Sequence, residues 1–185
     1  MSTWNPDLID LAWALATIRH QGQTYGSVVE GERIAYMTHI GSVAMTVAWA
    51  LQSDPRANAD LALPCAILHD TIEDTGTTHA ELASAFGAPI ADGVLALSKD
   101  ETLPTKAAQM ADSLRRIQLQ PREVWMVKLA DRIANLSAPP HYWNNDKILA
   151  YRDEARLIRA ELGAASEALA RRLDERIEAY PGYLR

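Results

Sequence analysis

The sequence predicts an all-α protein, and three observations support this fold class. Apolar residues recur at helical spacing in one segment after another, as they do between Leu8 and Ile18. Proline, glycine and capping residues separate these segments, for example at Asn5-Pro6 and at Pro139-Pro140. No segment gives a convincing strand pattern. We therefore expect a bundle of about eight to ten helices, formed by residues 1–185 as a single domain.

Composition and charge exclude several classes of function. The 185 residues are 48% hydrophobic and 23% charged, which is ordinary for a soluble globular protein. The net charge of −6, without a long cluster of lysine and arginine, argues against binding to nucleic acid. No apolar run approaches the length of a membrane span, and residues 1–6 do not begin a signal peptide. With Cys65 as the single cysteine, we expect a cytoplasmic protein without disulfides or membrane contact. The oligomeric state stays open.

The first helix begins at Asn5-Pro6, with Asn5 as N-cap, and extends to His20. A loop that contains two early glycines then follows, to about Ala35. Loops of this length in a compact domain are often functional. The second helix begins at Met37 and carries His39 in its first turn. A lone histidine there is more often structural than a ligand.

The stretch Leu68-His69-Asp70-Thr71-Ile72-Glu73-Asp74 follows an apolar run that predicts a buried helix. If the helix continues, His69 and Glu73 lie four residues apart on one face, as do Asp70 and Asp74. A His-Asp doublet suits a divalent cation, since it offers one nitrogen and one oxygen ligand. Glu73 and Asp74 are placed to hold or deprotonate an attacking water. The alternative is a solvated acidic helix end.

The following segments alternate between helices and short connectors. Thr78 and Glu81 form a capping box for a short helix that ends at Gly87, and His79 beside it is expected at the surface. We expect further helices at 88–97 and 106–119, joined by a polar connector, with Arg115 and Arg116 on the outside of the second.

Residues 124–136 are apolar on nearly all sides, which predicts a central helix. Asp131 and Asn135 share one face of it, and a buried aspartate there requires a cation or several hydrogen bonds. The alternative is a surface pair of Asp131 with Arg132 or Lys128. Two helices follow, from Lys147 to about Leu162 and then to Tyr180. Their arginines alternate with glutamates and predict a solvated face; they are Arg156, Arg159, Arg171, Arg172 and Arg176.

The order His39, His69-Asp70, Asp131 resembles the ligand order of the HD-domain metal-dependent phosphohydrolases. The similarity is closer to the hydrolase domain of RelA/SpoT-type alarmone enzymes and to the stand-alone small alarmone hydrolases. Three motifs carry it: the His20-Gln-Gly-Gln loop that leads to Tyr36-Met-Thr-His39, the stretch His69-Asp-Thr-Ile-Glu-Asp-Thr75, and Lys128-Leu-Ala-Asp-Arg-Ile-Ala-Asn-Leu136. The resemblance covers roughly residues 8–160, and we expect no synthetase domain after it.

Carried over position by position, the resemblance implies a helical HD domain with one metal site. Its ligands would be His39, His69, Asp70 and Asp131, and the ion in this family is usually Mn2+. Glu73 and Asp74 would match the acidic pair that activates the attacking water. The residues that would match substrate contacts are Asn135, Lys147, Tyr151 and, in a loosely aligned connector, Lys99.

The chain departs from the family in the first loop. Family members usually carry a basic residue soon after the Gly-Gln, near the nucleotide. Here Tyr25 stands at that place, the spacer to the metal histidine is longer, and Arg33 is its only cation. We expect Tyr25 to stack on the base, which any purine permits.

The resemblance therefore implies a 3′-pyrophosphohydrolase acting on hyperphosphorylated purine nucleotides, (p)ppGpp or (p)ppApp. One alternative keeps the chemistry but changes the substrate: an HD-type phosphatase for NADPH or other nucleotides. Another is a module that binds alarmones without hydrolysing them, which would not require Glu73 and Asp74. A helical interaction protein without a ligand would leave the three motifs unexplained.

Overall fold

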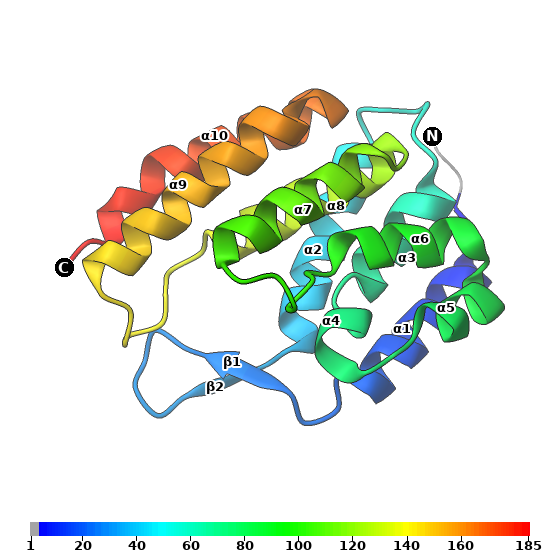
Figure 1. Cartoon of the computed structure of the whole chain (residues 1–185), viewed down its shortest axis with the longest axis horizontal. Coiled ribbons are helices and arrows are strands. Elements are labelled where there is room, and N and C mark those ends of the chain that lie inside the picture. Colours follow the sequence, from blue (N-terminus) through cyan, green and yellow to red (C-terminus); the bar gives the residue numbers. More distant parts are fainter. Residues whose placement is uncertain (1–3) are drawn as a thin grey trace.

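Helices account for nearly all the regular structure, as the sequence predicts. The computed structural model describes residues 4–185 (Figure 1). In chain order the elements are α1 (Pro6–Arg19), β1 (Thr24–Gly26), β2 (Arg33–Ala35), α2 (Met37–Leu51), α3 (Ala59–Leu68), α4 (Thr71–Thr75), α5 (His79–Phe86), α6 (Ala88–Leu97), α7 (Lys106–Gln118), α8 (Arg122–Asn135), α9 (Asn145–Leu162), the 3-10 helix η1 (Gly163–Ala165), α10 (Glu167–Ala179) and the 3-10 helix η2 (Tyr180–Tyr183).

The predicted caps explain where several helices begin. The side chain of Asn5 accepts a hydrogen bond from the amide of Asp7 at the start of α1. Thr78 and Glu81 form the expected capping box of α5. Asn144 caps α9 by accepting from the amide of Lys147, so that helix starts two residues earlier than predicted.

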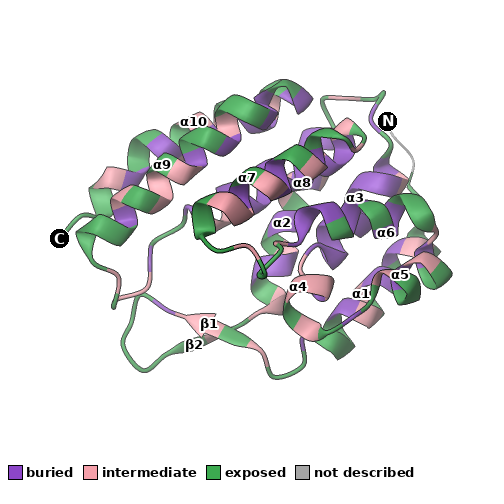
Figure 2. Ribbon diagram, viewed as in Figure 1, coloured by how far each residue is buried: buried purple, intermediate pink, exposed green. Residues whose placement is uncertain are grey.

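Helix α8 is the centre of the bundle. It packs against α2 and α3 on one side, α6 and α7 on another, and the C-terminal pair α9 and α10 on a third. Val124, Met126 and Leu129 are completely buried, and Figure 2 shows buried residues along α2, α3 and α8. Apolar residues from α1 to η2 form one buried cluster. That residues 1–185 form a single domain stays a prediction.

Within residues 4–185, no helix combines the length and hydropathy needed to cross a bilayer.

Residues 20–36 are not entirely loop, which corrects the prediction. β1 and β2 form an antiparallel hairpin in which Thr24 pairs with Ala35 and Tyr25 with Ile34. Each strand has three residues, too few for an alternating pattern to be visible. The hairpin lies at the edge of the helical bundle, beside the segment that joins α8 to α9 (Figure 1), where the amide of His141 donates to the carbonyl of Ser27 (3.3 Å).

The second correction concerns the helix that was expected to continue through His69. α3 ends at Leu68, and α4 starts at Thr71. Asp70 has φ −103° and ψ 0°, outside the helical region, and the hydroxyl of Thr71 donates to the carbonyl of Leu68 (2.7 Å). His69 and Asp70 therefore lie at a break between two helices, and Glu73 belongs to the second of them.

Candidate metal centre and adjoining cavity

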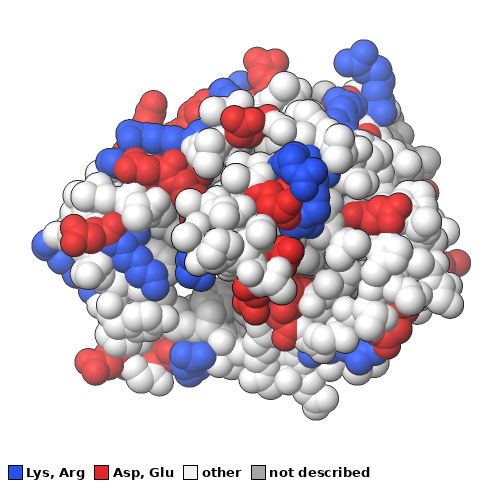
Figure 3. Space-filling model, in the orientation of Figure 1, with Lys and Arg blue, Asp and Glu red and all other residues white. Residues whose placement is uncertain are grey.

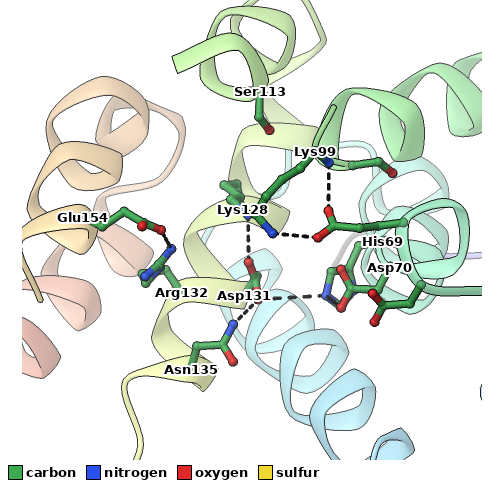
Figure 4. A network of polar contacts seen from close by, with 12 residues as sticks. His69, Asp70, Lys99, Ser113, Lys128, Asp131, Arg132, Asn135 and Glu154 are labelled. Atoms are coloured by element: carbon green, nitrogen blue, oxygen red, sulfur yellow. Dashed lines mark hydrogen bonds and ion pairs between the residues drawn. The ribbon is translucent and has the colours of Figure 1, made fainter. Parts of the chain in front are cut away.

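Four side chains from three separate parts of the sequence converge where three helical segments meet. His39 comes from the first turn of α2, His69 and Asp70 from the α3–α4 break, and Asp131 from α8. Because α2, α3 and α8 pack against one another, these groups point toward a common centre, as Figure 4 shows for His69, Asp70 and Asp131. The central helix α8 thus supplies Asp131, which lies more than 60 residues after the other three donors.

The distances between these groups suit ligands of one small cation. Nε2 of His39 lies 3.3 Å from Nε2 of His69 and 3.5 Å from Oδ1 of Asp131. Oδ2 of Asp70 lies 2.9 Å from Nε2 of His69 and 3.6 Å from Nε2 of His39. The donor atoms of His39, His69 and Asp70 all lie within 4.8 Å of one another. Two nitrogens and two oxygens match the chemistry of a borderline divalent ion.

Surrounding hydrogen bonds fix the orientation of the donors. Nδ1 of His69 donates to the carbonyl of Ala66 (2.8 Å), which leaves the lone pair of Nε2 directed at the centre. The hydroxyl of Tyr36 donates to Asp70 (2.5 Å). Asp131 accepts from Lys128 (3.0 Å) and from the amide of Asn135 (2.5 Å). The alternative of a surface pair of Asp131 with Lys128 is wrong in its location, because both residues are buried.

The electrostatic field of the centre favours positive charge. Burial opposes a charged His69, but the negative charges of Asp70 and Asp131 outweigh it and raise the pKa of this imidazole to about 9. Burial also opposes an ionised Asp131, but Lys128 and the histidines hold its pKa well below the usual value. A site that stabilises a proton in this way would also stabilise a metal cation. The four residues therefore fit a divalent metal.

The acidic pair Glu73 and Asp74 lies on α4, directly after the break. Glu73 accepts hydrogen bonds from both the backbone amide (2.8 Å) and the ammonium group (2.7 Å) of Lys99. Burial opposes the charge on Lys99, but Glu73 outweighs it and the pKa of Lys99 is raised. Asp74 accepts from the side-chain amide of Gln23, which belongs to the first loop (2.9 Å). Both carboxylates are thus held in place by hydrogen bonds.

A cavity of about 930 Å³ adjoins the centre. His39 and Asn135 line it, together with two other residues predicted to contact substrate, Tyr25 and Tyr151. Lys99 and Lys147 are not among its lining residues; the ammonium of Lys147 instead lies 4.3 Å from the centre of the Trp143 ring. On the face seen in Figure 3, acidic and basic side chains border a hollow in the surface.

Several residues of the site were not predicted from the sequence. Gln23 and Tyr36 lie inside quoted motifs, but a motif does not show which side chain contacts which carboxylate. Arg132 places its guanidinium 4.1 Å from the centre of the Tyr151 ring and pairs with Glu154. The prediction that the late arginines form a solvated face holds for Arg171, which is exposed, but Arg172 and Arg176 are only partly exposed. All three line the cavity. Likewise Arg116 is not simply outside, because it donates to the carbonyls of Leu95, Ala96 and Ser98.

Comparison with known proteins agrees with the geometry. Residues 12–168 match the HD domain family. Over 117 residues, 61% of the chain, the sequence is 32% identical to the guanosine-3′,5′-bis(diphosphate) 3′-pyrophosphohydrolase MESH1 of Danio rerio. Over 138 residues, 71% of the chain, it is 34% identical to the GTP pyrophosphokinase rsh of Brucella melitensis. The matched regions span 64% of the first relative and 17% of the second, less than two thirds of either.

The fold is also found in a solved structure. That structure is described as a metazoan ortholog of SpoT that hydrolyzes ppGpp and plays a role in starvation responses. The two chains superpose with a TM-score of 0.80 over 99% of this chain and 100% of the other, at 21% sequence identity. The predicted helical fold and the resemblance to HD-domain proteins are confirmed.

Proposed function

Because the chain belongs to the HD domain family, we propose that it is a metal-dependent 3′-pyrophosphohydrolase of hyperphosphorylated purine nucleotides. The observation that carries the proposal is the convergence of His39, His69, Asp70 and Asp131 beside a carboxylate pair and a large cavity. The substrate class rests on two similar proteins, whose descriptions specify hydrolysis of ppGpp or of guanosine-3′,5′-bis(diphosphate). We propose Mn2+ as the ion, one per chain.

The metal would be held by the four convergent side chains. When bound there, a divalent cation supplies Lewis acidity to the reacting phosphoryl group. Tyr36, Lys128 and Asn135 keep the two aspartates oriented, so the donors are arranged before substrate arrives.

The carboxylates of α4 would activate the nucleophile. Glu73 and Asp74 orient a water molecule and accept its proton, while Lys99 and Gln23 keep them in place. The water oxygen bonds to the phosphorus next to the ribose, and the bond from that phosphorus to the ribose 3′ oxygen breaks. Pyrophosphate leaves, and the 3′ oxygen takes up a proton.

The cavity would hold the rest of the nucleotide. Tyr25 and Tyr151 offer aromatic surfaces for a base or ribose, and Asn135 offers an amide next to the metal donors. We propose Lys147 and Lys99 as further contacts for phosphate. The ammonium of Lys99 would then have to donate hydrogen bonds to both Glu73 and the substrate phosphate.

A panel of nucleotides tests the function. ppGpp, ppApp and NADPH are each incubated with Mn2+-loaded protein, and the products are separated by anion-exchange chromatography. We expect rapid loss of one or both alarmones. Release of phosphate from NADPH without cleavage of either alarmone would overturn the proposal in favour of a phosphatase.

A further inference from the structure

Helix α10 contributes a basic wall to the cavity. Arg172, Arg176 and Tyr180 follow one another at intervals of four residues, so they lie along one face of the C-terminal segment. All three line the cavity, as do Arg171 and the part of α2 from Ser42 to Trp49. None of the four metal donors comes from α10, so this wall is separate from the metal centre.

Two buried polar atoms on this face have no hydrogen-bond partner within residues 4–185. They are the hydroxyl oxygen of Tyr180, a residue that is 1% exposed, and Nε of Arg176. Arg159 of the neighbouring α9, by contrast, pairs with Asp174 (2.9 Å). Because buried donors are nearly always satisfied, this face indicates a ligand that brings acceptor oxygens.

The charge of the wall favours an anion. Three arginines and one glutamate of α10 line the cavity, and the glutamate, Glu175, is already paired with Arg172 (2.8 Å). Guanidinium groups bind phosphate through two parallel hydrogen bonds, a geometry that suits a phosphate chain. A phosphorylated ligand therefore fits this wall better than a neutral one.

The length of the cavity indicates which of the two phosphate chains of the nucleotide lies near α10. The lining of α2 extends from His39 to Trp49, ten positions further along the helix, which corresponds to a rise of about 15 Å. A nucleotide whose 3′-diphosphate reacts at the metal centre carries its second phosphate chain on the other side of the ribose. That chain needs cations away from the metal, and the arginines of α10 supply them.

We propose that Arg172, Arg176 and Tyr180 form a subsite for the 5′-phosphate chain of the substrate. The proposal rests on the proposed function, and it makes α10 a determinant of specificity. The enzyme then prefers substrates with longer 5′-phosphate chains, because each added phosphate brings oxygens within reach of a second arginine.

The kinetic test compares guanosine 3′-diphosphates with no phosphate, two phosphates or three phosphates at the 5′ position. In Arg176→Gln, kcat/KM for the two 5′-phosphorylated substrates should fall by about 10- to 100-fold, mainly through KM. The substrate with a 5′-hydroxyl should change by less than about twofold. Arg172→Gln, which changes a partly exposed residue, is the second variant if Arg176→Gln does not fold. The matched control is Arg156→Gln, because Arg156 pairs with Asp153 on the outside of α9.

Calorimetry with GDP separates this subsite from the reaction itself, since GDP carries the 5′-diphosphate and no 3′ phosphate. The wild type should bind GDP, and Arg176→Gln should bind it about tenfold or more weakly. If ppGpp is not cleaved but GDP affinity still depends on Arg176, the subsite stands and the proposed function fails. If ppGpp is cleaved while GDP affinity is the same in both arginine variants, or if all three substrates lose activity equally, the subsite is wrong.

Discussion

At the scale of single residues, Glu73 separates catalysis from metal binding. Glu73→Gln keeps the size of the side chain and an oxygen that can accept from Lys99, but it removes the charge that accepts a proton. We expect turnover to fall by about 100-fold or more, with metal content and substrate affinity retained. Steady-state kinetics and metal analysis measure both quantities. Near-normal turnover in Glu73→Gln and also in Asp74→Asn would exclude this pair from water activation.

Tyr25 should increase the affinity for purine nucleotides without discriminating between guanine and adenine. It lies in β1, lines the cavity and meets the Tyr36 ring edge-on, with 6.4 Å between ring centroids. Stacking on its face contributes about 1–3 kcal/mol per base and depends little on which base is bound. Tyr25→Ala should therefore weaken ppGpp and ppApp alike, and Tyr25→Phe should be nearly silent. A tenfold change in the ratio of their kcat/KM values in Tyr25→Phe would show that the hydroxyl reads the base.

The residues that could be predicted are those whose chemistry is unusual in its local context. A histidine next to an aspartate after an apolar run, and an aspartate inside an apolar helix, both stand out in a sequence. The partners of these residues do not: Lys99 lies 26 positions after Glu73, and only the fold brings them together. The cavity beside the arginines of α10 was not predictable, because alternating charge looks the same whether a face meets solvent or a cavity.

At the scale of elements, two helical glycines should respond in opposite ways to alanine. A Cβ at Gly93 of α6 would lie 2.9 Å from Sγ of Cys65 and 2.9 Å from a methyl of Val124. Overpacking at this buried contact with α3 and α8 should lower the free energy of unfolding by about 1–3 kcal/mol, despite the better helix propensity of alanine. The control is Gly41→Ala in α2, where the nearest atom, on Trp13, is 3.9 Å away. That variant should be neutral or more stable by up to about 1 kcal/mol.

Urea unfolding of both variants measures these effects. Equal stability of Gly93→Ala and the wild type would mean that α6 can move away from α3 and α8. The close packing at Gly93 would then not be a constraint on the bundle.

Helices were predictable at this scale because capping residues and apolar spacing act locally. The ends of α5 and α6 agree with the predicted segments, and those of α8 lie within two residues of them. α10 ends at Ala179, one residue before the predicted end at Tyr180. The β-hairpin and the break after Leu68 were not predictable. Each depends on contacts with distant segments, such as the bond between Ser27 and His141, or on a local bond that competes with the helix, as at Thr71.

At the scale of the whole molecule, surface carboxylates should make the fold sensitive to acid. A hydrogen bond from Arg122 holds the pKa of Asp54 below its usual value, and one from Arg116 does the same for Asp112. Groups whose pKa is lower in the folded state bind more protons when the chain unfolds, so their contribution is present above the unfolded pKa and is lost as pH falls through the folded value. The free energy of unfolding should therefore decrease from pH 7 to pH 3. Urea titrations at both values check this, and equal or higher stability at pH 3 would contradict it.

The central claim is that His39, His69, Asp70 and Asp131 hold a metal on which hydrolysis depends. Its most direct test is to add Mn2+ to metal-stripped protein while bound metal and ppGpp hydrolysis are followed in the same samples. The wild type should bind one ion per chain, with activity rising in parallel, whereas His39→Ala and Asp70→Ala should lose both. Full metal occupancy in both variants, or full activity of the stripped wild type, would contradict the account.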